Sequence, residues 1–258
     1  MDLTTTYLGF HLPHPLIVGA SPLVDDIDMV RQLEDAGAAA IVMHSLFEEQ
    51  ITLEHRVAEL AIEVHRDAFA EALGFLPDPD TFALGPDEYL EQIRRLKEAV
   101  DVPVIGSLNG STNEGWLEYA PLMEQAGADA IELNVYALEV DTQQTAAAVE
   151  RRTVDMLRTV RSKVNIPVAM KLSPFYTAVA HFAKELDQAG ADGLVLFNRF
   201  YQPDIDVEQL EVEHCLHLST SEELLLRLRW LAILSPELGG SLAATGGIHT
   251  PIDALKAI

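Results

Sequence analysis

The sequence predicts an α/β fold, a single (β/α)8 barrel of the TIM type, with seven of its strands visible in this chain. Three observations support this prediction. Two kinds of strand-like segment alternate along the chain, amphipathic helical patterns lie between them, and the length of 258 residues suits one barrel domain. The predicted domain spans residues 1–258.

The strands fall into two repeating types. Three segments combine a helix end, a glycine suited to a left-handed C-terminal cap and an apolar strand: EDAGAAAIVM (34–43), EQAGADAIEL (124–133) and DQAGADGLVL (187–196). In the other three, a proline opens an apolar run: HPLIVGAS (14–21), VPVIGSLNG (102–110) and IPVAMKLSP (166–174). The two types alternate, and SLAATGG (241–247) makes a seventh strand.

Amphipathic helical patterns separate these strands, among them DEYLEQIRRLKEAV (87–100), NEGWLEYAPLMEQAG (113–127) and AAAVERRTVDMLRTVRSKV (146–164). Apolar strands that alternate with such helices predict a parallel sheet covered by helices. The 63 residues between Gly127 and Gly190 equal two βα units of ordinary barrel size. A doubly wound open sheet is the alternative, and the absence of a G-x-G-x-x-G turn after the first strand weakens it.

The last segment, LAATGGIHTPIDALKAI (242–258), ends inside the seventh helix. A closed barrel of this type needs an eighth strand. We therefore expect the natural polypeptide to continue past Ile258 with a strand, a second glycine-containing turn and a closing helix.

Composition restricts the class of protein. The net charge of −24 argues against a nucleic-acid partner, because a phosphate backbone attracts a basic surface. The single cysteine, Cys215, excludes an internal disulfide bond and fits a reducing compartment. No stretch approaches the roughly 18 apolar residues of a membrane span, and the N-terminus lacks the basic start of a signal peptide. We expect a cytoplasmic protein without a membrane partner.

Two insertions interrupt the repeat, at about residues 47–86 and 200–217. The first is long enough for an extra helix and a proline-rich loop, and the second suits a short hairpin. Both follow the carboxyl ends of predicted strands. Because that end of an α/β barrel carries the active site, both segments are candidate lids.

Polar and small residues gather at the predicted strand ends and would meet at one mouth. They are Gly19, Ala20, Ser21, His44, Ser45, Ser107, Asn109, Gly110, Asn134, Tyr136, Lys171, Ser173, Asn198, Arg199, Thr245, Gly246 and Gly247. An isolated Asn in such a place more often caps or turns the chain than binds a ligand. Lys171 is different, since a lysine in an apolar strand needs an anion or a polar ligand to face.

The turn TGGIHTPIDALK (245–256) is the most specific of these features. Two glycines that open onto a helix present free backbone N–H groups and a positive dipole end. Such a turn allows an acidic protein to bind phosphate, and barrels place a phosphate site after strands 7 and 8.

Four segments together resemble the dihydroorotate dehydrogenases, FMN barrels of the class 1 kind: DLTTTYLGFHLPHPLIVGAS (2–21), IELNV (131–135), VAMKLSPFYT (168–177) and the 245–256 turn. The similarity runs along essentially the whole chain, in order and at the right intervals. It implies an oxidoreductase with FMN as cofactor and roles for several strand-end residues. Ala20 and Ser21 would contact the flavin, Asn109 and Asn134 the flavin and substrate, Lys171 the flavin N1/O2 side, Gly246 and Gly247 the phosphate, and Asn198 the substrate.

The sequence also departs from this family. Class 1 members carry a Cys base three residues after the Asn of the fourth strand, and this chain has Ala137 there. The family Lys after the second strand is missing as well, with Met43, His44 and Ser45 in that neighbourhood. Alternative proton acceptors are Tyr136 and His44, together with the second insertion's His214, Cys215 and His217. Each of these residue types is more often structural in such places.

We therefore predict that Lys171, Asn134 and Tyr136 form the catalytic set, without a metal. The expected reaction is hydride transfer from dihydroorotate or a related small molecule to FMN. Two alternatives remain open at this point: a flavin-binding or electron-transfer subunit without turnover, suggested by Ala137, and a Schiff-base aldolase or lyase using Lys171. The resemblance further implies a homodimer, and an electron-transfer partner is a further possibility.

Overall fold

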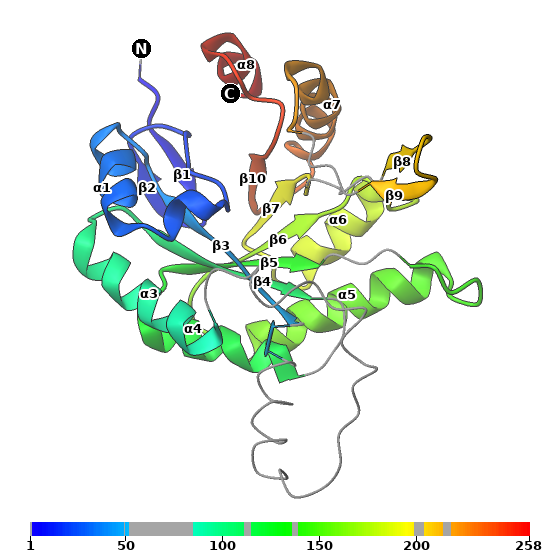
Figure 1. The fold of residues 1–258 in the computed structure, drawn as a ribbon, viewed down its shortest axis with the longest axis horizontal. Helices are drawn as coiled ribbons and strands as arrows, with labels where there is room; N and C mark the ends of the chain where they lie inside the picture. The colour runs from blue at the N-terminus through cyan, green and yellow to red at the C-terminus, as the bar shows by residue number, and fades with distance from the viewer. Residues whose placement is uncertain are drawn as a thin grey trace, which may run out of the picture.

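The computed structural model describes residues 2–48, 50–51, 85–110, 115–135, 139–198, 204–213 and 218–258. Its centre is a six-stranded parallel sheet in the order β10-β7-β6-β5-β4-β3 (Figure 1). The strands are β3 (Ile41–Phe47), β4 (Val104–Gly110), β5 (Ala130–Val135), β6 (Val168–Leu172), β7 (Gly193–Leu196) and β10 (Ser241–Ala244). Each is the apolar segment expected from the repeat.

The first predicted strand, 14–21, differs from the expectation. It is reduced to an isolated parallel bridge between Val18 and Ile41. The N–H of Val18 donates to Ala40 (3.0 Å) and the N–H of Val42 donates to Val18 (2.9 Å), so this segment still lies beside β3. Among the described strands only β3 pairs with this segment, whereas β4, β5, β6 and β7 each pair on both sides.

The spatial order of the strands follows their order in the chain, from Val18 at one edge to β10 at the other. A doubly wound sheet would reverse direction at a switch point, so the order excludes that alternative. The predicted α/β barrel class is confirmed, with six strands and one bridge in place of seven strands.

Helices cover one face of the sheet. They are α1 (Ile27–Asp35), α3 (Pro86–Ala99), α4 (Tyr119–Ala126), α5 (Ala146–Arg161), α6 (Val179–Gln188) and α7 (Leu224–Leu234), with short 3-10 helices at Pro22–Val24, Gly115–Glu118 and Ser221–Glu223. The last helix, α8 (Pro251–Ala257), packs against α7. Side-chain caps begin several of them: Asp26 accepts from the N–H of Asp28, and Thr145 accepts from the N–H of Ala148. Gly127 ends α4 in the left-handed conformation, as its sequence pattern predicts.

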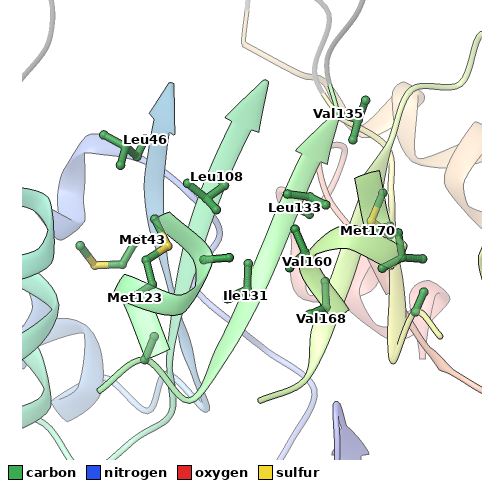
Figure 2. Close-up of a cluster of buried hydrophobic side chains, with 14 of the residues drawn as sticks. Met43, Leu46, Leu108, Met123, Ile131, Leu133, Val135, Val160, Val168 and Met170 are labelled. Atoms are coloured by element: carbon green, nitrogen blue, oxygen red, sulfur yellow. The ribbon is translucent and has the colours of Figure 1, made fainter. Parts of the chain in front are cut away.

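The main core lies between the sheet and these helices. Alternate residues of the central strands point into it: Ile131, Leu133 and Val135 from β5, and Val168 and Met170 from β6 (Figure 2). Because successive strand residues face opposite sides, Glu132, Asn134 and Lys171 belong to the inner face of the sheet.

A two-stranded hairpin, β1 (Thr5–Tyr7) and β2 (Phe10–Leu12), packs against that inner face. Its Tyr7, Leu8 and Leu12 join inward residues of the strands in a second apolar cluster: Val42, Ile105, Ala130, Ala169 and Val195. The N–H of Leu8 donates to Ser241 Oγ at 2.9 Å, which ties the hairpin to β10. The hairpin therefore fills the interior near the amino ends of the strands.

The second insertion contains the predicted hairpin, β8 (Asp204–Asp206) paired antiparallel with β9 (Glu211–Glu213). The extra helix expected in the first insertion falls largely on residues 52–84, outside the described residues. Among the helices that the structure describes, none combines the length and apolar character that crossing a membrane requires.

Tyr89 of α3 stabilises an irregular part of the sheet. The pairing of β3 with β4 shifts register between Val42 and Ser45. At this bulge the Tyr89 hydroxyl lies 2.9 Å from the carbonyl oxygen of His44 and 3.2 Å from that of Ser107, and it accepts from the N–H of Ser107 at 2.9 Å. The side chain thus replaces ladder hydrogen bonds that the bulge interrupts.

We expect Tyr89→Phe to lower the free energy of unfolding by about 1–3 kcal/mol, since it leaves buried backbone groups without a partner. Urea unfolding followed by circular dichroism measures this change. Unaltered stability would show that the bulge does not depend on the hydroxyl.

Candidate functional site

Three of the predicted strand-end residues are neighbours across the sheet. The register pairs Asn109 of β4 with Asn134 of β5, and Asn134 with Lys171 of β6. All three are buried, with exposed fractions of 8%, 4% and 8%. Parallel strands bring their carboxyl ends to one edge, so the structure places this polar row where α/β barrels carry their active sites.

Lys171 has an acidic partner that the sequence analysis missed. Its Nζ donates to Glu132 Oε1 at 3.0 Å, and the side chains are 10% and 5% exposed. The alternation in IELNV could have predicted this partner. Ile131 and Leu133 face the helices, so Glu132 and Asn134 must both face inward.

Asn134 carries a polar atom suited to a ligand. Its Oδ1 is buried and has no hydrogen-bond partner within the described parts of the chain. Buried polar atoms are normally satisfied, and exceptions often mark a place where a ligand or water binds. This atom fits the role that the sequence predicts for Asn134.

The turn after β10 contains the two glycines expected at the phosphate. Gly246 and Gly247 have φ values of 79° and 81°, which side-chain-bearing residues rarely adopt. A Cβ on Gly246 would lie 3.1 Å from Arg227 Nη2, and one on Gly247 would lie 2.5 Å from the backbone nitrogen of Leu224. Only glycine therefore allows the turn to lie so close to α7.

Arg227 is a second functional candidate that the sequence analysis missed. It is 6% exposed and sits in α7, where its Nε donates to the carbonyl of Thr245 (3.0 Å) and its Nη1 to that of Glu223 (2.9 Å). Its guanidinium thus borders the glycine turn. The helix LLLRLRWLAIL contains two basic residues in an apolar run, Arg227 and Arg229, and only Arg227 is buried.

Hydrogen bonds also fix the turn from the other side. The N–H of Gly247 donates to Ser219 Oγ at 3.1 Å, so this donor is already engaged. Asp253 accepts from the hydroxyls of Ser221 (2.7 Å) and Thr250 (2.9 Å) and from the N–H groups of His249 and Thr250. These bonds, led by the one from Ser221, lower the pKa of Asp253 to about 2.

One cavity of about 570 Å³ joins the two parts of the site. Lys171 and Glu132 line it, as do Thr245, Gly246 and the hairpin residue Tyr7. Its volume falls in the range of small-molecule sites, about 300–1,000 Å³. Asn109 and Asn134 do not line it, and they lie beside Lys171 at the strand ends.

Ala20, Ser21 and Asn198 belong to the described residues but do not line this cavity. Ala20 is half-buried against the inner apolar cluster, next to the cavity-lining Gly19, and Ser21 precedes the first 3-10 helix. Asn198 is half-buried after β7, and its N–H donates to Leu172 of β6 at 2.7 Å. Tyr136 lies outside the described residues, so its predicted role stays a prediction.

The end of β3 does not supply a free cation in place of the family lysine. Met43 is buried in the outer core, and Ser45 shares a hydrogen bond with Ser107 at 2.8 Å. His44 Nδ1 lies 2.5 Å from Asp25 Oδ1, and its ring packs edge-on against Tyr89. The described residues contain no group of three or more His, Cys, Asp or Glu side chains that could hold a metal ion.

The fold and site together define an α/β barrel enzyme in which a buried lysine and a Gly-Gly turn contribute to the same cavity. The sequence model of the dihydroorotate dehydrogenase family matches residues 3–218, and the chain belongs to that family. The enzyme is therefore an oxidoreductase of the dihydroorotate dehydrogenase type, as predicted.

Individual relatives agree with this assignment. The catalytic subunit of dihydroorotate dehydrogenase B (NAD(+)) from Thermoplasma acidophilum is 28% identical, with 100% of this chain and 83% of the relative covered. The subunit of that name from Geobacillus kaustophilus is 32% identical over 67% of this chain and 56% of its own length. The NAD-dependent dihydropyrimidine dehydrogenase subunit PreA of Escherichia coli is 27% identical over 76% of this chain and 48% of its own.

The lowered pKa of Asp253 makes the glycine turn sensitive to acid. A carboxylate with a folded-state pKa below its unfolded value stabilises the protein above about pH 4 and loses that contribution as pH falls through about 2. We expect Asp253→Asn to remove this part of the pH dependence. Urea midpoints measured from pH 5 to pH 2 test it, and parallel curves for both proteins would contradict the assignment.

Proposed function

We propose that this protein is an FMN-dependent dehydrogenase that oxidises the ring of dihydroorotate or a closely related dihydropyrimidine. The observation that carries the proposal is the row of Asn109, Asn134 and Lys171, in which Lys171 lines the same cavity as Gly246 of the glycine turn. A flavin needs a cation or donor near N1/O2 and an anion site for its phosphate, and Lys171 and Gly246 both line this cavity.

The residues present fit FMN. Lys171 and the unpartnered Oδ1 of Asn134 would face the isoalloxazine, with Asn109, Ala20 and Ser21 around it. Gly246 and the nearby guanidinium of Arg227 would hold the phosphate, and the N–H of Gly247 could join them only by leaving Ser219. When bound, FMN supplies a hydride acceptor. Lys171 would then stabilise the negative charge that collects on the ring system, and the buried walls would exclude water.

The substrate class follows from chemistry that the relatives share. Their names specify dihydroorotate and dihydropyrimidine, and dihydroorotate is itself a dihydropyrimidine that bears a carboxylate. Oxidation of its C–C bond to C=C removes a hydride from one carbon and a proton from the next. Asn198 and Tyr136 would contact the substrate.

The relatives also suggest the electron acceptor. They are named as catalytic subunits of an NAD(+) enzyme or as a subunit of an NAD-dependent one. We therefore propose that a separate electron-transfer chain connects the flavin of this protein with NAD(+). The homodimer that the family resemblance implies stays a prediction.

The structure disfavours a Schiff-base enzyme. A Schiff-base lysine attacks a carbonyl carbon with a free Nζ, and the Nζ of Lys171 donates a hydrogen bond to Glu132 at 3.0 Å. A subunit without turnover is likewise disfavoured, because the relatives are catalytic subunits.

Lys171→Met tests the flavin site. The purified wild type should bind FMN with the visible absorption of a flavoprotein, and the variant should hold a flavin that is harder to reduce. A loss of about tenfold in the equilibrium for reduction corresponds to about 30 mV for a two-electron couple. Anaerobic dye-coupled titration measures the potential.

Lys97→Met is the matched control, since Lys97 forms an ion pair with Asp129 (2.7 Å) just before β5, at the amino ends of the strands. It should leave the potential unchanged. Lys171→Gln, which can still donate to Glu132, repeats the test if the Met variant unfolds. A wild type without FMN binding would refute the proposed function, and an unchanged potential would refute the role of Lys171.

The missing base gives a second test. With Ala137 at the family's Cys position, oxidation of dihydroorotate by the native protein should be slow. Ala137→Cys should raise it by about 10² to 10⁴-fold, the usual contribution of a general base. Fast native turnover that this substitution does not change would show that another residue takes the proton.

A further inference from the structure

Glu132 has no role in the proposed reaction so far, yet it is the closest charged neighbour of Lys171. The two side chains come from adjacent strands, β5 and β6, and both are buried. Glu132 is the one ion-pair partner of Lys171 in the part of the chain that the structure describes.

Glu132 lies deeper in the barrel than Lys171, farther from the carboxyl ends of the strands. The register sets Glu132 opposite Ala169 and Lys171 opposite Asn134, so Lys171 is one inward position nearer the strand ends. The negative charge of Glu132 also reaches the hairpin below, because it adds to the effect of burial in raising the pKa of Tyr7. Lys171 thus lies between a buried carboxylate and the mouth.

We propose that Glu132 is a positioning residue, a buried counter-ion that holds Lys171 in the cavity and sets how much of its positive charge acts on the bound flavin. The inference rests on the proposed function. An isolated ammonium would present a full charge to the N1/O2 side of the ring. The ammonium paired at 3.0 Å presents a dipole instead, which stabilises the anionic reduced flavin less strongly.

The paired arrangement also keeps the cation inside the barrel. Burial of a single charge is costly, and a hydrogen-bonded partner offsets most of that cost. Glu132 therefore allows a lysine to be buried in an apolar interior, but it weakens the electrostatic effect of that lysine on the flavin. The flavin of this protein should have a lower reduction potential than a flavin beside an unpaired lysine.

Glu132→Gln separates this role from a structural one. It removes the charge and keeps a hydrogen-bond acceptor for Lys171. We expect a reduction equilibrium at least tenfold more favourable than in the wild type, a rise of about 30 mV in the two-electron potential of bound FMN. The measurement is the same anaerobic titration, with FMN affinity followed in parallel. A purely structural role would weaken FMN binding or stability without raising the potential.

Two further variants act as controls. Glu132→Asp keeps the negative charge and should stay within threefold of the wild-type equilibrium. Asp129→Asn breaks the ion pair with Lys97 at the other end of β5 and should leave the potential unchanged. Glu132→Met provides a second charge-removing variant, with the same expected rise, should the Gln variant fail to fold.

The outcomes separate the two proposals. FMN binding by the wild type with an unchanged or lowered potential in the charge-removing variants overturns the role of Glu132 alone. Failure of the wild type to bind FMN overturns the proposed function and this inference with it. A rise in both charge-removing variants, absent from both controls, supports the inference.

Discussion

The strict alternation of side chains across β4, β5 and β6 is the constraint on which the structure depends. Ile131, Leu133 and Val135 face the helices and belong to the core (Figure 2). Glu132 and Asn134, which lie between them, must therefore face inward. A one-residue slip of β5 would bury Glu132 against α4 and α5 and would remove Asn134 from the mouth. The same pattern therefore stabilises the fold and positions the site.

The inward face is polar near the carboxyl ends of the strands and mainly apolar near their amino ends, where Ser241 is the polar residue that accepts from Leu8. Deeper in the barrel, the hairpin residues Tyr7, Leu8 and Leu12 cover Val42, Ile105 and their neighbours. Gly193 permits this contact, since a Cβ there would lie 2.8 Å from Leu8 Cδ2. The hairpin thus supplies an apolar base, and the polar groups above it are left for a ligand.

Local patterns predicted most of the fold, because each strand and helix carried its own signal. Gly127 and Gly190 marked helix ends, and the proline-led runs became β4 and β6. The first strand was shorter than predicted, since its pairing depends on β3 across the sheet and not on its own residues. In the site, Lys171 and the glycine turn stood out as local anomalies. Glu132 and Arg227 did not, because their importance comes from neighbours far along the chain.

Lys171 and Arg227, the two buried cations among the described residues, solve one electrostatic problem in different ways. The chain has 41 acidic and 17 basic side chains, so its overall field repels an anionic cofactor. The positive charge of Arg227 acts on the glycine turn with little weakening. Its acidic neighbour Glu223 lies 3.6 Å away, and the Glu223 side chain is 44% exposed to screening water. Lys171 shares its charge with a carboxylate at 3.0 Å that is almost fully buried. A stronger cation raises the affinity for a phosphate. Beside a redox centre, however, a strong cation stabilises the reduced form and so makes the transfer of electrons to an acceptor less favourable. A weakened cation beside the ring and a stronger one beside the phosphate would meet both requirements.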